Sequence, residues 1–169
     1  MISNRLELES FIPMLEYDLQ GGSRNYQQFT EELASYATGK NLQFIASAIR
    51  TKTAKTFTDV AEPALTSRND PVVMSNWTRE VEQLAKDKAA WAEGNRVISG
   101  VLRRHLPTNL IAILESKATW NAACESESGI AAWIIVSDTV TNSIPNETEA
   151  EKKYRIYNNL NNCTQNDNE

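Results

Sequence analysis

Apolar side chains recur at helical spacing along most of the chain. The longest periodic segment covers residues 75–106, and its most regular row has a period of seven: Trp77, Leu84, Trp91 and Ile98. Val81 and Leu102 lie on the adjoining row, one helical turn further on. This pattern predicts one amphipathic helix of about eight turns with a continuous apolar stripe.

Local signals define the ends of this predicted helix. Ser75 is the expected N-cap, and Pro107 stops the helix because proline cannot continue the hydrogen-bond ladder. Gly94 and Gly100 each cost about 1 kcal/mol relative to alanine inside a helix. We therefore expect a kink or break near Gly94.

Shorter helices are predicted on both sides of this segment. The ranges are 23–38, with a Ser23 cap and Gly39 as C-cap; 41–50; 110–115, capped by Thr108; and 130–140. Segment 130–140 is apolar on all sides, which favours a buried helix, with a strand as the alternative. Segment 51–74 contains two prolines and many Thr and Ser residues and is predicted to be mostly loop.

These elements predict an all-α protein. We expect a single compact helical domain of about five to seven helices over residues 1–141. A polar, Asn-rich tail follows over 142–169. Within it, Tyr154, Tyr157 and Leu160 lie three residues apart, so segment 149–160 is a candidate for a short docking helix.

The composition narrows the class of protein. With 41% hydrophobic residues the chain can build a core, and its net charge of −5 excludes a polycation that binds nucleic acid through bulk charge. Cys124 and Cys163 provide neither a zinc site nor a disulfide framework. The longest apolar stretch, 130–136, is far shorter than the roughly 20 residues that span a bilayer. Because acids occupy the start, where a signal peptide would be apolar, we expect a soluble cytoplasmic protein without membrane contact.

Candidate catalytic groups are few. His105 is the sole histidine, and at the end of its helix it is expected to complement the helix dipole or to pack. Cys124 has acidic neighbours, which disfavour a reactive thiolate. Adjacent carboxylates such as Glu31 and Glu32 point about 100° apart on a helix and do not converge. We therefore expect no enzyme, no cofactor and no metal.

One basic cluster is a candidate site. It comprises Arg96, Arg103, Arg104 and Lys117. Four cations close together could bind RNA phosphate or another polyanion. A solvated helix end is the simpler interpretation, because no exposed aromatic residues alternate with these cations to stack bases.

The four tryptophans also lie in predicted helices: Trp77, Trp91, Trp120 and Trp133. Their spacing predicts that most are buried. An exposed tryptophan would indicate a surface that contacts another protein.

The order of landmarks resembles the Gag protein of Ty1/copia-type LTR retrotransposons. An apolar run at 12–15 precedes a turn at Leu19 to Gly22, and Asn25 and Tyr26 then come shortly before Phe29, which stands where the family usually has Trp. Further on, segment 87–91 leads to Ile98, Leu102 and Leu106, and Ala118, Thr119 and Trp120 follow. The resemblance covers about residues 12–135.

This resemblance implies a capsid-like, non-enzymatic structural protein that self-associates through helix faces. By the same analogy Arg103 and Arg104 would face packaged RNA. The alternative, which needs no resemblance, is a small helical module that binds another macromolecule as an adaptor, inhibitor or effector. The expected partner is a second copy of the chain, with another protein as the alternative.

Overall fold

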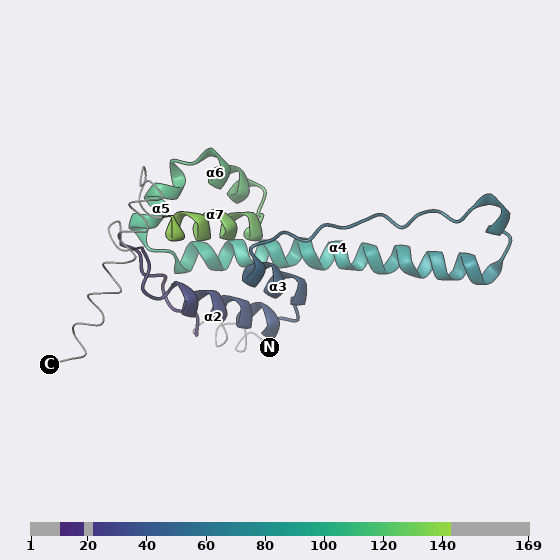
Figure 1. The fold of residues 1–169 in the computed structure, drawn as a ribbon, viewed down its shortest axis with the longest axis horizontal. Helices are drawn as coiled ribbons and strands as arrows, with labels where there is room; N and C mark the ends of the chain where they lie inside the picture. Colours follow the sequence, from purple (N-terminus) through teal and green to yellow (C-terminus); the bar gives the residue numbers. More distant parts are fainter. Residues whose placement is uncertain (1–10, 19–21, 143–169) are drawn as a thin grey trace, which may run out of the picture.

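A computed structural model describes residues 11–18 and 22–142 (Figure 1). This part of the chain holds six α-helices and no strand: α2 (Tyr26–Gly39), α3 (Gln43–Thr51), α4 (Pro71–His105), α5 (Thr108–Glu115), α6 (Ala118–Glu125) and α7 (Gly129–Thr141). A 3-10 turn, η1, spans Leu65–Ser67. The predicted all-α single domain is confirmed. The predicted docking helix at 149–160, and the tail beyond Asn142, lie outside the described residues.

The helices are arranged around one end of α4. In Figure 1, α2 and α3 lie on one side of its C-terminal part and α5, α6 and α7 lie on the other. Buried residues from all six helices, together with Ile12 and Leu15 of the N-terminal segment, form one hydrophobic core. Helix α7 is part of that core, so the predicted buried helix at 130–140 is confirmed and the strand is excluded.

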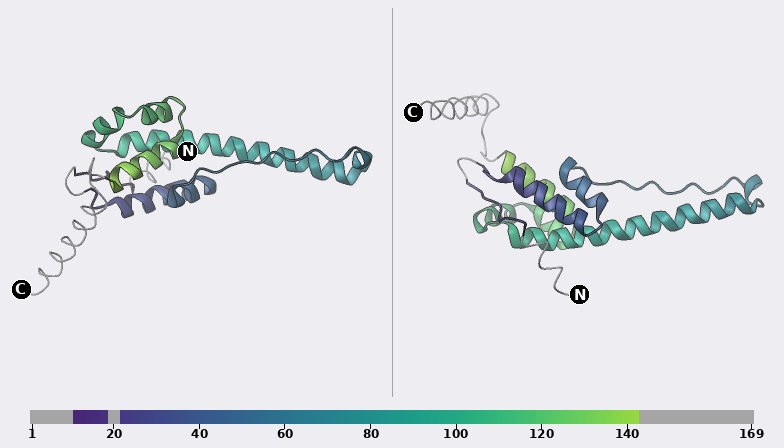
Figure 2. Two further views of the ribbon diagram at one scale, coloured as in Figure 1. Left: turned by 45° about the horizontal axis from the view of Figure 1, so that its top comes forward. Right: turned by 90° about the horizontal axis from the view of Figure 1, so that it is seen from below.

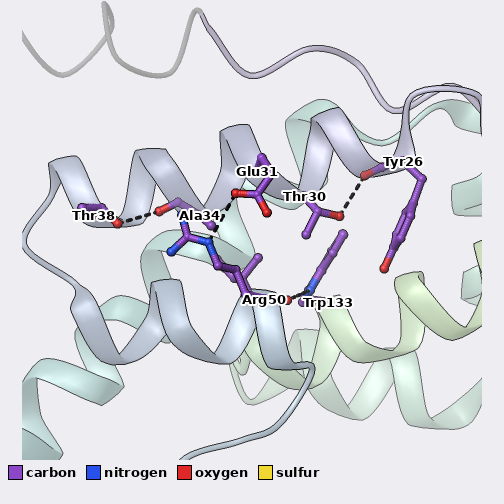
Figure 3. A network of polar contacts seen from close by, with 8 residues as sticks. Tyr26, Thr30, Glu31, Ala34, Thr38, Arg50 and Trp133 are labelled. Carbon is purple, nitrogen blue, oxygen red and sulfur yellow. Dashed lines mark hydrogen bonds and ion pairs between the residues drawn. The ribbon is translucent and has the colours of Figure 1, made fainter.

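Trp133 of α7 joins three helices at the centre of the core. Its ring is fully buried and stacks with Tyr26, at 5.8 Å, and with Phe29, at 5.9 Å, both from α2. Its indole Nε1–H donates a hydrogen bond to the Ile49 carbonyl of α3 at 3.0 Å (Figure 3). An indole needs a partner for its N–H when it is buried, and here the partner fixes α3 against α7.

Two glycines allow helices to approach closely. Gly94 does not break α4, which is continuous from Pro71 to His105, so the predicted break is wrong. Gly94 is buried beneath Ile45 of α3, whose side chain would overlap a Cβ at this position. At Gly129 an added Cβ would lie 2.6 Å from the backbone nitrogen of Ser99 and would overlap the carbonyl oxygen of Asn95. The absence of side chains, rather than backbone freedom, is therefore what both positions require.

Helix α4 begins one turn earlier than predicted. Asp70, not Ser75, is the N-cap: its carboxylate accepts hydrogen bonds from Val72 N–H at 2.9 Å and Val73 N–H at 3.4 Å. Pro71 occupies the first turn, where its missing N–H costs nothing. Ser75 lies inside the helix.

The ends of two shorter helices also differ from the prediction. Helix α2 begins after Asn25 rather than Ser23, and Gly39 belongs to the helix. Asn41 takes the left-handed conformation, with φ 61°, and Leu42 N–H returns to the Ala37 carbonyl at 2.9 Å, as in a Schellman motif. Helix α5 begins at Thr108, which does not act as the cap.

We predict that Gly129→Ala and Gly100→Ala have opposite effects on stability. At Gly129 the methyl group meets backbone atoms that cannot move aside, so overpacking should lower the free energy of unfolding by about 1–3 kcal/mol. At Gly100 the methyl group makes an ordinary contact, 3.5 Å from the end of the Arg104 side chain, and should raise stability by up to about 1 kcal/mol. Urea denaturation of both variants measures the difference. Equal stability of the two would contradict the close approach of α7 to α4.

Candidate interaction surfaces

More than half of α4 extends beyond the core. The buried residues of this 35-residue helix begin at Gly94, and residues 71–92 project away from the other helices (Figure 1). We call residues 71–92 the arm. At 1.5 Å per residue the arm is about 33 Å long.

An extended segment, residues 52–70, follows the arm from its foot to its tip (Figures 1 and 2). We call this segment the strap. It is mostly loop, as predicted, with η1 near the tip. Phe57 of the strap packs edge-on against Trp91, with ring centroids 6.3 Å apart. Asp59 accepts a hydrogen bond from Lys88 Nζ at 2.7 Å and forms an ion pair with it.

The regular apolar row of α4 is divided between the core and the arm. Ile98 is buried in the core, whereas Trp77, Leu84 and Trp91 are half-buried on the arm, with Trp91 at its foot packed against the core. We call these three arm residues the stripe. Trp120 and Trp133 are buried, so the predicted burial of the tryptophans holds for two of the four. The Nε1–H of Trp77 is covered, yet no acceptor reaches it within the described structure.

Further apolar side chains near the arm face solvent. Val72 is 67% exposed, Val81 is 38% exposed, and Leu65 of η1 is 76% exposed. Val81 lies on the row that adjoins the stripe, one helical turn after Trp77. It is exposed because none of the described helices covers the arm there.

The members of the predicted basic cluster have partners within the chain. Arg96 forms an ion pair with Glu93, one turn away, at 2.6 Å. Arg103 donates to the Cys124 carbonyl at 3.1 Å, at the C-terminal end of α6, where a cation complements the helix dipole. Lys117 donates to Thr139 Oγ1 of α7 at 2.6 Å. Arg104 is exposed on α4.

The structure gives Arg96, Arg103 and Lys117 separate partners. Arg103 binds the C-terminal end of α6, whereas Lys117 directly precedes α6 and binds α7. Arg96 lies two turns before Arg103, about 10 Å along α4. The contacts of Arg103 and Lys117 hold α6 against α4 and α7, and polyanion binding by these residues stays a prediction.

An open hollow of about 620 Å³ lies at the foot of the arm, between α4 and the α6–α7 turn. Its lining includes Trp91, Glu93, Arg96, Ser126, Glu127 and Ser128. The one guanidinium in this set is already paired with Glu93. The hollow therefore presents mixed polarity without a set of groups that converge on a ligand.

The candidate catalytic residues have structural contacts. The main-chain carbonyl of His105 accepts a hydrogen bond from Leu15 N–H at 2.9 Å, which attaches the N-terminal segment to the end of α4. Cys124 is a half-buried free thiol packed against the core. Among the residues that the structure describes, no group of three or more His, Cys, Asp or Glu side chains is placed to bind a metal. None of the described helices is long and apolar enough to cross a membrane.

No family model, curated protein or solved structure matches the chain. The resemblance to Ty1/copia-type Gag proteins therefore stays a prediction.

We predict that the pKa of Asp59 in the folded protein lies below its ordinary value. The hydrogen bond from Lys88, and then the charge of Lys88, lower this pKa. The contact with Lys88 therefore stabilises the fold at pH values above the ordinary pKa of the carboxyl group. This stabilisation is lost as the pH falls through the lowered pKa of Asp59. NMR titration of the Asp59 carboxyl group measures it.

Two variants complete this titration. Lys88→Met should return the Asp59 pKa to its ordinary value, whereas Lys86→Met, which removes an exposed lysine of the same helix, should not. If the pKa of Asp59 is the same in both variants as in the wild type, Asp59 of the strap and Lys88 of the arm do not form this ion pair in solution.

Proposed function

We propose that the protein is a non-enzymatic structural protein of the cytoplasm that self-associates through its helix faces. The observation that carries the proposal is the arm, a helix of about 33 Å that leaves the core with apolar side chains only half covered. The role is the one that the resemblance to capsid proteins implies. Such proteins act by presenting helices to copies of themselves and need no catalytic residues.

Physical reasoning supports the arm as the contact. Most helical stability in proteins comes from packing of an apolar face, and a helix that leaves the core has lost its helical neighbours. A second helix would supply the missing contact. Weak contacts of this kind build assemblies when each subunit offers several of them.

The charge of the arm favours a like partner. The whole chain carries a net charge of −5, which opposes association of copies. The arm itself holds three basic and three acidic side chains and is neutral: Arg79, Lys86, Lys88, Glu80, Glu82 and Asp87. Two arms therefore meet without net repulsion. RNA contact through Arg103 and Arg104 is a secondary part of the proposal.

A second candidate function is a helical module that binds a different macromolecule. Phe11 and Met14 favour it, because their large apolar side chains are 71% and 53% exposed at the base of the molecule, away from the arm. A partner that covers this surface would not require self-association. The two functions differ in how the mass in solution depends on concentration.

We predict that the mass of the full chain rises with concentration. Light scattering after size exclusion should give 19.0 kDa at low concentration and larger species as concentration increases. Because apolar contacts carry the association, added salt should not dissociate the larger species. Salt would dissociate species that were joined by ion pairs. A mass of 19.0 kDa at every concentration and salt would contradict self-association and leave the binding module as the function.

A further inference from the structure

The structure suggests how copies of the chain meet. We propose that the strap is a releasable cover, and that the stripe beneath it (Trp77, Leu84 and Trp91) binds the stripe of a second copy with the two arms antiparallel. This inference rests on the proposed function. It names the surface through which copies associate, the second copy as the partner, and the strap as the segment that controls access to the surface.

The strap is held weakly. Every residue of 52–70 is exposed or half-buried. No backbone hydrogen bond joins residues 52–64 to α4, both of which are described by the structure. Apart from the cap of α4 at Asp70, the polar contact between strap and arm in the described structure is the ion pair of Asp59 and Lys88, whose side chains are 88% and 47% exposed. Exposed ion pairs contribute little stability, so this pair adds little to the cost of releasing the strap.

The stripe suits a helical partner better than an extended one. Apolar residues at a strict period of seven are the pattern by which one helix packs along another. The strap, which is extended, leaves all three residues of the stripe half-exposed. The Trp77 Nε1–H is covered without an acceptor while the strap follows the arm. A buried polar group without a partner is costly, so this cover is a poor one.

The order of the stripe fits a twofold interface. A contact between two identical copies must be self-complementary. The stripe reads tryptophan, leucine, tryptophan in both directions about Leu84. With the arms antiparallel and Leu84 facing Leu84 of the second copy, each Trp77 lies level with Trp91 of the other copy.

The same register uses the full length of both arms. Pro71, the first residue of the arm, then lies level with Val97 of the second copy, next to the place where that copy's buried residues begin. Each arm thus ends where the other copy's core starts. Four indoles offer roughly 600–1,000 Å² of surface, near the lower limit of about 1,000 Å² for specific interfaces. The expected association is weak and depends on concentration.

Leu84→Glu tests the surface. A carboxylate at the centre of the stripe would be buried against its copy, so we expect the dissociation constant of the dimer to rise at least tenfold. Ala90→Glu is the matched control, because it adds the same charge one residue from Trp91 on an exposed side of the arm, away from the stripe. Neither position lies in the core, so both variants should fold. Circular dichroism and thermal melting check this.

Asp59→Lys tests the strap. Lysine at 59 repels Lys88 and favours release, so the dissociation constant of the dimer should fall roughly twofold to fivefold, the range expected for an exposed pair. Combining Asp59→Lys with Lys88→Asp restores opposite charges and should return the wild-type constant. Asp138→Lys, which makes the same change at an exposed aspartate of α7, should leave the constant unaltered.

The direction of the arms is measured with a spin label at Ser75, with Cys124→Ser and Cys163→Ser as background. In antiparallel arms the two labels lie about 27 Å apart along the helix axes, whereas parallel arms place them about 10 Å apart. The shorter distance would overturn the antiparallel register.

The outcomes separate this inference from the proposed function. If the wild type remains a monomer throughout, the function fails and the inference fails with it. If the wild type associates but Leu84→Glu associates equally well, the function stands and the stripe is not the interface. If Leu84→Glu dissociates while Asp59→Lys has no effect, the surface stands and the strap does not control it.

Discussion

The architecture depends on a mismatch of helix lengths. Helix α4 has 35 residues and is about 52 Å long, whereas α2, the next longest described helix, has 14 residues and is about 21 Å long. The shorter helices cover the C-terminal part of α4, where α7 and α3 approach its backbone at Gly129 and Gly94. None of the described helices covers the remainder. The arm and its extended strap follow from this difference.

Much of the fold was predictable from the spacing of apolar residues, because a period near 3.6 reports helices directly. Spacing shows which face of a helix is apolar, however, and not what covers that face. Ile98 and Trp77 share one row, but the first is buried in the core and the second lies on the arm. Asp70 was missed as the cap for a related reason: it precedes the row by two turns, although Asp before Pro71 is a strong helix start.

The candidate site was less predictable than the fold. Charge in sequence does not reveal whether a cation has a partner at a distance of 20 residues or more. Arg103 reaches a carbonyl of α6, and Lys117 reaches a hydroxyl of α7. Both residues therefore stabilise helix packing, which a sequence pattern cannot separate from binding. The seven-residue apolar spacing indicated the stripe, whereas the local charge indicated the basic cluster. Of these two, the stripe is the surface that the structure leaves incompletely covered.

Competition between strap and partner determines when copies would meet. The strap is part of the same chain as the arm, so its effective concentration at the stripe is on the order of millimolar. A second copy in dilute solution does not reach that value and loses the competition. As the concentration of the chain rises, a second copy competes more strongly, because the strap fits the stripe poorly. A cover that fits poorly but is tethered therefore keeps chains apart in dilute solution and permits arms to pair when the chain is concentrated.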